Sequence, residues 1–131
     1  MEWTYHNEPF TAPGSDFIGF VYIIANTMSG RRYIGKKNFF FTKTKKIKGR
    51  NKRIKSESDW KTYWSSSEEL KADVALLGPQ NFTREIIHLC KSKGTMNYLE
   101  AKEQFMNSVL ESPEWYNSYI QVRCHRSHVK L

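Results

Sequence analysis

Cysteine is scarce in this chain of 131 residues, which contains only Cys90 and Cys124. Two cysteines so far apart make no disulfide framework, so we expect a reducing, cytoplasmic environment. Long apolar runs are missing as well, because none approaches the roughly 18 residues that a transmembrane helix requires. The N-terminus is neither basic nor followed by a clean apolar stretch, and we expect no signal peptide. These absences argue against a secreted or membrane-bound protein.

Acidic residues are also few. The chain has 13 Asp and Glu against 21 Lys and Arg, which gives a formal net charge of +8. A positive surplus of this size, with a pI near 9.5, is typical of proteins that bind polyanions. Because 131 residues is the size of one domain, we expect a single fold whose natural partner is a polyanion.

The segment 17–41 carries the strongest structural pattern in the chain. Two runs of β-branched and aromatic residues flank a glycine-containing turn at 26–31, which predicts a β-hairpin. Tyr22 and Tyr33 then lie on adjacent strands, where Cβ atoms can be about 5 Å apart. Two lysines follow the second tyrosine, namely Lys36 and Lys37. Paired phenols beside ammonium groups suit an anionic ligand, although strand tyrosines are often only structural.

The segment 42–58 is the most biased in composition. It contains eight basic residues: Lys43, Lys45, Lys46, Lys48, Arg50, Lys52, Arg53 and Lys55. No helical or strand periodicity is visible, and the charges repel one another, so we expect a segment that is flexible when free. We interpret it as a nucleic-acid-binding insertion that contacts phosphates and carries no code for base sequence. The alternative is a solvated loop.

Two helices and a third strand complete the expected fold. Ser67 can cap a helix over 67–77, and Gly78 follows it as a stop signal. Alternation predicts a strand over 82–90, and an apolar stripe predicts a helix over 98–110. We therefore expect an α+β fold with a small central antiparallel sheet of about three strands flanked by helices.

Composition also divides the chain into parts. Residues 1–16 are polar and contain two prolines, so we expect an irregular N-terminal arm whose aromatic residues pack onto the domain. Residues 17–122 are expected to form the single domain, with the basic insertion 42–58 inside it. Residues 123–131 form a basic tail that we expect to add positive charge to the same surface.

The motifs Val21-Tyr22-Ile23 and Tyr33-Ile34-Gly35 resemble the paired signature of the GIY-YIG nuclease superfamily. The second motif matches in full. The first departs from the family, because Phe20 stands where glycine is usual and Val21 replaces isoleucine. The resemblance covers roughly residues 17–118, makes 17–122 a catalytic domain, and points to a homing-type enzyme of a bacterial or phage-infected host cell.

The resemblance implies a metal-dependent DNA endonuclease that hydrolyses phosphodiester bonds. By this resemblance Tyr22 is the general base, and Tyr33 orients the water or a phosphate oxygen. The ordinary pKa of tyrosine, near 10, is high for a base, and Lys36 or Lys37 would favour the phenolate. Asn117 resembles the asparagine that orients a neighbouring catalytic group. No residue can be assigned to the arginine that the family carries after its second motif.

The superfamily places one metal-binding glutamate on a helix, and this chain offers two candidates. Mg²⁺ (or Mn²⁺) prefers carboxylate oxygen and keeps several waters. Glu100 precedes an alanine as in related phage enzymes, but it could instead complete a capping box with Asn97. Glu103 stands at the family-like spacing from Asn117, but it could be an exposed helix acid. We keep both as metal ligands at this point.

Two other functions fit the same residues. A catalytically inactive nucleic-acid-binding module would use the basic segment and need neither the acid nor Asn117, and a structural partner of an acidic protein would need only the charge. No separate DNA-reading domain is visible in the sequence. A nuclease of this size would therefore need a homodimer or an accessory DNA-binding partner for specific double-strand cleavage.

Overall fold

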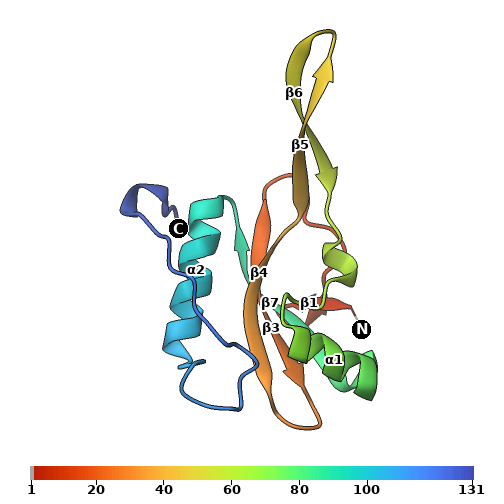
Figure 1. The fold of residues 1–131 in the computed structure, drawn as a ribbon, viewed down its shortest axis with the longest axis vertical. Helices are drawn as coiled ribbons and strands as arrows, with labels where there is room; N and C mark the ends of the chain where they lie inside the picture. Colours follow the sequence, from red (N-terminus) through yellow and green to blue (C-terminus); the bar gives the residue numbers. More distant parts are fainter. Residues whose placement is uncertain (1) are drawn as a thin grey trace.

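The hairpin that carries the two tyrosine motifs forms one edge of the sheet (Figure 1). The structure, a computed structural model, describes residues 2–131. Its strands are β1 (Trp3–Tyr5), β2 (Glu8–Pro9), β3 (Gly19–Asn26), β4 (Arg32–Asn38), β5 (Phe40–Ile47), β6 (Arg50–Glu57) and β7 (Phe82–Cys90). Its helices are α1 (Glu68–Leu77) and α2 (Lys93–Met106), with short 3₁₀ turns η1 (Trp60–Thr62), η2 (Pro79–Asn81) and η3 (Arg126–His128).

The main sheet has five strands in the order β2-β1-β7-β3-β4. β1 pairs with β7 in parallel and every other pair is antiparallel, so the sheet is mixed. The α+β class is confirmed, but the expectation of about three antiparallel strands is wrong. The two additional strands come from the N-terminal segment 1–16, which is therefore not an irregular arm over its whole length.

Trp3 explains why the N-terminal segment joins the sheet. Its indole is only 2% exposed and packs edge-on against Phe20 and Tyr22. Its Nε1 donates a hydrogen bond of 2.7 Å to the carbonyl of Trp60. Burying a large aromatic side chain stabilises a fold more than most single contacts do. Burial of Trp3 therefore stabilises the pairing of this otherwise polar segment with the sheet.

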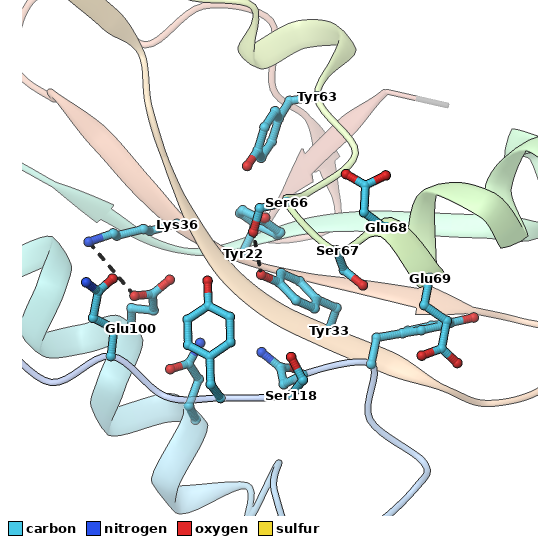
Figure 2. Close-up of a pocket in the computed structure, with 15 residues that line it drawn as sticks. Tyr22, Tyr33, Lys36, Tyr63, Ser66, Ser67, Glu68, Glu69, Glu100 and Ser118 are labelled. Atoms are coloured by element: carbon cyan, nitrogen blue, oxygen red, sulfur yellow. Dashed lines mark hydrogen bonds and ion pairs between the residues drawn. The ribbon is translucent and has the colours of Figure 1, made fainter.

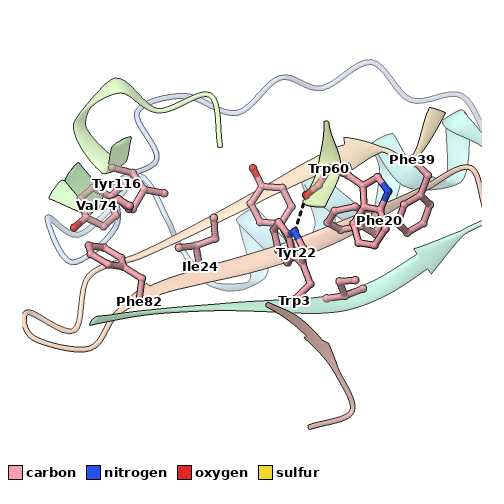
Figure 3. Close-up of a cluster of buried hydrophobic side chains, with 11 residues drawn as sticks. Trp3, Phe20, Tyr22, Ile24, Phe39, Trp60, Val74, Phe82 and Tyr116 are labelled. Atoms are coloured by element: carbon pink, nitrogen blue, oxygen red, sulfur yellow. Dashed lines mark hydrogen bonds between the residues drawn. The ribbon is translucent and has the colours of Figure 1, made fainter. Parts of the chain in front are cut away.

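Strand β3 separates two hydrophobic cores because its side chains alternate. Phe20, Tyr22 and Ile24 face the layer of η1 and α1, where they meet further buried aromatic residues (Figure 3). Val21 faces the other layer and packs with Met96 of α2. The sheet is thus covered on both faces, and phenylalanine replaces the usual motif glycine because residue 20 fills a core.

Strand β7 has the expected boundaries but not the expected faces. A bulge shifts the register so that Val21 is opposite His88 while Tyr22 is opposite Ile86. As a result Ile86 packs into the α1 core and Cys90 into the α2 core. The simple alternation predicted for 82–90 is therefore interrupted, as happens wherever an extra residue enters one strand of a pair.

The two helices agree with the sequence to different degrees. Ser67 caps α1, and its side chain accepts from the backbone N–H of Leu70, as predicted. Helix α2 starts earlier than predicted, because Ser92 caps it by accepting from Thr95, and it ends at Met106. The alternative capping box at Asn97 is therefore wrong. No helix within residues 2–131 combines the length and apolarity needed to cross a membrane.

Strands β5 and β6 pair only with each other and project beyond the domain (Figure 1). We call residues 40–57 the basic arm. Apart from half-buried Phe40, every residue of its two strands is exposed. The segment forms two paired strands although its sequence shows no strand periodicity. Sequence alternation fails here for a physical reason, since neither face of the ribbon is buried and neither needs apolar side chains.

Candidate active site

A cleft of about 420 Å³ opens where the edge strand β4 meets α1, α2 and the segment after residue 115 (Figure 2). Five of the residues proposed from the sequence line it: Tyr22, Tyr33, Lys36, Glu100 and Asn117. They come from the β3–β4 hairpin, from helix α2 and from a C-terminal segment, three parts that are distant from one another in the chain. Lys37 and Glu103 are not part of its lining.

Tyr22 and Tyr33 form a stacked pair at the base of the cleft. Their ring centroids are 6.1 Å apart with an interplanar angle of 29°. In the strand register Tyr22 is opposite Gly35 and Tyr33 is opposite Ile24, so the tyrosines are diagonal neighbours. A Cβ on Gly35 would lie 2.5 Å from the Tyr22 hydroxyl and 2.7 Å from Cε1 of Tyr33. Glycine is therefore needed at this position to leave space for both rings.

The environment of the phenols favours their neutral form. Burial raises the pKa of Tyr22 well above its usual value, and the phenols of Tyr33 and Tyr63 raise it further. Burial also raises the pKa of Tyr33, although its hydrogen bond with Ser66 opposes the shift. Any chemistry that uses a phenolate must therefore overcome desolvation at this site.

Tyr63 and Ser66, which were not predicted from the sequence, form the opposite side of the cleft. The Tyr63 ring meets that of Tyr22 edge-on at 6.2 Å, and the Ser66 hydroxyl is 3.1 Å from that of Tyr33. Both residues belong to the connection between η1 and α1, and both are labelled in Figure 2. No motif marks this connection, which is held at the site by the packing of Trp60 into the core and by a hydrogen bond of 2.9 Å from Arg84 Nη1 to the Tyr63 carbonyl.

Glu100 presents a carboxylate to the cleft from α2. Its side chain is 13% exposed, and the Lys36 ammonium lies 4.0 Å from Oε1 (Figure 2). Burial raises the pKa of Glu100, and Lys36 opposes that shift. Lys36 is held in turn by Oδ1 of Asn97, one turn earlier on the helix. In residues 2–131 Lys36 is the partner of the Glu100 carboxylate, which leaves oxygen lone pairs for a further ligand.

The other two candidates lie outside the cleft. The Glu103 carboxylate is 2.9 Å from Nε2 of His88 on β7, so it bridges the helix to the sheet. Lys37 points to the opposite side of β4 from Lys36, as consecutive strand residues do. Its ammonium pairs with Asp59 at 2.6 Å and lies 4.0 Å above the Tyr63 ring. The basic arm lies outside the cleft lining as well.

Asn117 ties the C-terminal segment to the edge of β4. Its Oδ1 accepts from the backbone N–H of Ile34 at 3.1 Å, and its Nδ2 donates to the Ile34 carbonyl at 2.8 Å. The amide therefore replaces a missing neighbour strand at a buried edge, where unpaired backbone groups would be costly. Gln104 donates to the same carbonyl at 2.9 Å. The side-chain amides of Asn117 and Gln104 thus fix the backbone of Ile34, which lies between Tyr33 and Gly35.

Acidic side chains outnumber basic ones in the lining of the cleft. Glu68, Glu69 and Glu100 line it, and Lys36 is the basic residue among its lining. Within residues 2–131 no group of three or more His, Cys, Asp or Glu side chains could hold a metal ion. Glu100 offers a carboxylate whose partner ammonium, on Lys36, is 4.0 Å away, and carboxylate oxygen is the ligand type that Mg²⁺ prefers.

Replacing Gly35 with alanine is expected to abolish most activity without removing any functional group. The added Cβ would displace the Tyr22 phenol, with which it clashes at 2.5 Å, and a misplacement of about 1 Å can cost roughly 10²-fold. Nuclease assays of Gly35→Ala measure the effect, and circular dichroism verifies that the variant is folded. Full activity in Gly35→Ala would contradict the packing argument.

The two hairpin tyrosines, Glu100 of α2 and Asn117 line one cleft, as the resemblance to the GIY-YIG nuclease superfamily predicts. The sequence matches the family model described as "Putative endonuclease segE, GIY-YIG domain" over residues 3–120. The chain therefore belongs to this family of the GIY-YIG nucleases. No curated protein and no solved structure matches it significantly.

Proposed function

We propose that this chain is a metal-dependent DNA endonuclease that hydrolyses phosphodiester bonds in the cleft. The observation that carries the proposal is the convergence of Tyr22, Tyr33, Lys36, Glu100 and Asn117 on one cavity. A binding module has no need of a buried carboxylate beside paired phenols. The match to a nuclease family over most of the chain supports the same reading.

The residues take different roles in this proposal. Tyr22 accepts the proton of the attacking water, and Tyr33 orients that water or a phosphate oxygen. Lys36 contributes positive charge beside Glu100. Asn117 acts as a positioning residue, because its contacts are to the backbone of Ile34. Gln104, which shares the Ile34 carbonyl, is a second positioning residue.

Glu100 would hold the metal ion, Mg²⁺ or Mn²⁺, through its carboxylate. When bound, the ion would neutralise charge on the scissile phosphate and on the leaving oxygen. Glu100 suits this role because the ammonium of Lys36, at 4.0 Å, only partly neutralises its charge. A bound cation would stabilise the charged carboxylate, which burial disfavours. Glu103 is the weaker candidate, since its carboxylate is already engaged by His88.

Incubation of supercoiled plasmid with the purified chain tests the proposal. Nicked or linear DNA is expected with Mg²⁺ or Mn²⁺, and none with EDTA. A parallel preparation of the Tyr22→Phe, Glu100→Gln variant controls for contaminating nuclease. Binding without cleavage in both preparations would contradict the proposal and favour the inactive binding module, which the eight cations of the basic arm also suit.

One cleft of this kind acts on one strand at a time. Cutting both strands at a site would require a second copy of the chain or an accessory DNA-binding partner. Analysis of the plasmid products over time distinguishes a chain that cuts one strand at a time from an assembly that cuts both strands together. Successive nicks give relaxed circles first, whereas a paired assembly gives linear molecules directly.

A further inference from the structure

The basic arm carries cations on both of its faces. Cross-strand register places side chains of paired residues on the same face. One face carries three cations among other side chains: Lys46, Arg53 and Lys55, with Phe40, Thr42, Thr44, Asn51 and the acid Glu57. The other face carries four cations: Lys43, Lys45, Arg50 and Lys52, with Phe41, Ile47, Ile54 and Ser56. A ribbon that lay along one row of phosphates would need only one basic face, so this distribution indicates anionic surfaces on both sides.

The arm is not needed for the hydrophobic cores. Its strands are exposed from Phe41 to Glu57, and neither core cluster contains a residue from 41–57. Self-repulsion among so many cations makes such a ribbon costly in isolation. A feature that costs stability and adds nothing to the core is best explained by the partner that it contacts.

We propose that the basic arm inserts into the major groove of duplex DNA, with one face toward each phosphate backbone. The inference rests on the proposed function, which makes duplex DNA the partner of the chain. A two-stranded ribbon with its side chains is roughly 10 Å thick, and the major groove of B-DNA is about 12 Å wide. The major groove of A-form RNA is too narrow for side chains to read, which disfavours double-stranded RNA.

The arm is long enough to contact the same DNA duplex whose scissile phosphate lies in the cleft. The ribbon leaves the end of β4 and points away from the sheet (Figure 1). Ile47, next to the turn at the tip, lies eleven positions after Lys36 in the cleft, which gives a reach of at most about 36 Å in extended conformation. One helical turn of B-DNA spans about 34–36 Å. The arm can therefore contact the duplex up to about one turn from the scissile phosphate.

The turn at the tip of the arm contains Lys48 at a position where lysine is conformationally unfavourable. Lys48 and Gly49 both have positive φ, 51° and 76°, which is the type I′ geometry of a two-residue hairpin turn. Asparagine is favoured over lysine at the first of these positions. A lysine that adopts this conformation places a cation at the leading end of the inserted ribbon. Lys48→Asn is therefore a variant that should preserve the turn and remove only the charge.

Salt-dependent binding tests whether both faces meet phosphate. Two matched variants carry three changes each: Lys46→Gln, Arg53→Gln, Lys55→Gln on one face, and Lys43→Gln, Lys45→Gln, Lys52→Gln on the other. Binding of a labelled 30-base-pair DNA is measured in EDTA from 50 to 200 mM salt. Each variant is expected to reduce the slope of log K against log salt by about 2.7, because each phosphate contact contributes about 0.9. Lys48→Asn should reduce it by about 0.9.

Methylation of guanine N7 by dimethyl sulfate tests the groove, since N7 lies in the major groove. The saturated complex should show N7 protection that both triple variants lose. A slope change in only one variant, protection that survives both, or tighter binding to duplex RNA would overturn the inference. Circular dichroism verifies that each variant is folded. Because EDTA prevents cleavage, two-sided binding by a chain that never cuts DNA would instead contradict the proposed function alone.

Discussion

Replacing Tyr22 with phenylalanine is expected to lower cleavage by about 10²- to 10⁴-fold, the range for loss of a general base. The change removes one hydroxyl and keeps the ring that packs against Trp3 and Tyr33. The fold should therefore be unaffected. Single-turnover cleavage of plasmid measures the rate, and Tyr5→Phe is the matched control because that residue lies in β1 outside the cleft. Equal rates in both variants would contradict a chemical role for Tyr22.

The pH dependence of the rate tests the role of Tyr22 more sharply. Because burial raises the pKa of Tyr22 above its usual 10, less than about one molecule in 10³ carries the phenolate at pH 7. If the phenolate is the base, the rate should rise about tenfold per pH unit from pH 6 to 9. A rate that is flat over this range would contradict the base and favour a neutral phenol that orients the water.

The fold should not interfere with this measurement. A raised pKa in the folded state means that the neutral phenol is favoured by folding. This contribution to stability is fully present below the unfolded pKa of about 10 and is lost as the pH rises through the higher folded pKa. Assays between pH 6 and 9 therefore lie outside the window of alkaline unfolding. Thermal denaturation at pH 9 and above verifies this directly.

The sequence predicted the elements whose signals are local. The hairpin depends on adjacent runs and a turn, the capped start of α1 depends on Ser67, and strand 82–90 depends on alternation, and all three are present. Local sequence signals do not predict a strand whose pairing is stabilised by packing against a segment that is distant in the sequence. The pairing of β1 with β7 depends on burying Trp3 beneath Trp60, and no nearby residue in the sequence indicates this contact.

The candidate site was predictable only in part for the same reason. Motif resemblance identified Tyr22, Tyr33, Glu100 and Asn117, and the hairpin pattern identified Lys36, which the structure brings to the same cleft. The resemblance could not choose between two acids three positions apart on a helix. The choice depends on which acid faces β4 and which faces β7, and thus on how α2 is rotated over the sheet. The alternation in segment 42–58 was invisible because a ribbon exposed on both faces has no apolar period.

Replacing Glu100 with glutamine is expected to reduce metal-dependent cleavage by about 10³-fold. Charge stabilisation by a bound ion is worth several kcal/mol, and each 1.36 kcal/mol is a factor of ten. The matched variant Glu103→Gln should retain activity near the parent level, because that carboxylate contacts His88 rather than the cleft. Binding of Mn²⁺, followed by electron paramagnetic resonance in the absence of DNA, should be lost in Glu100→Gln and retained in Glu103→Gln.

Thermal stability should change in the opposite direction from activity. Burial raises the pKa of Glu100, so its charged form opposes folding at neutral pH, and a neutral amide of nearly the same shape removes that cost. Glu100→Gln is therefore expected to be at least as stable as the parent, whereas Glu103→Gln loses the contact with His88 and should be less stable. Loss of Mn²⁺ binding in Glu103→Gln instead would assign the metal to the other acid. Higher stability together with lost Mn²⁺ binding in Glu100→Gln would support a carboxylate whose role is to bind a cation.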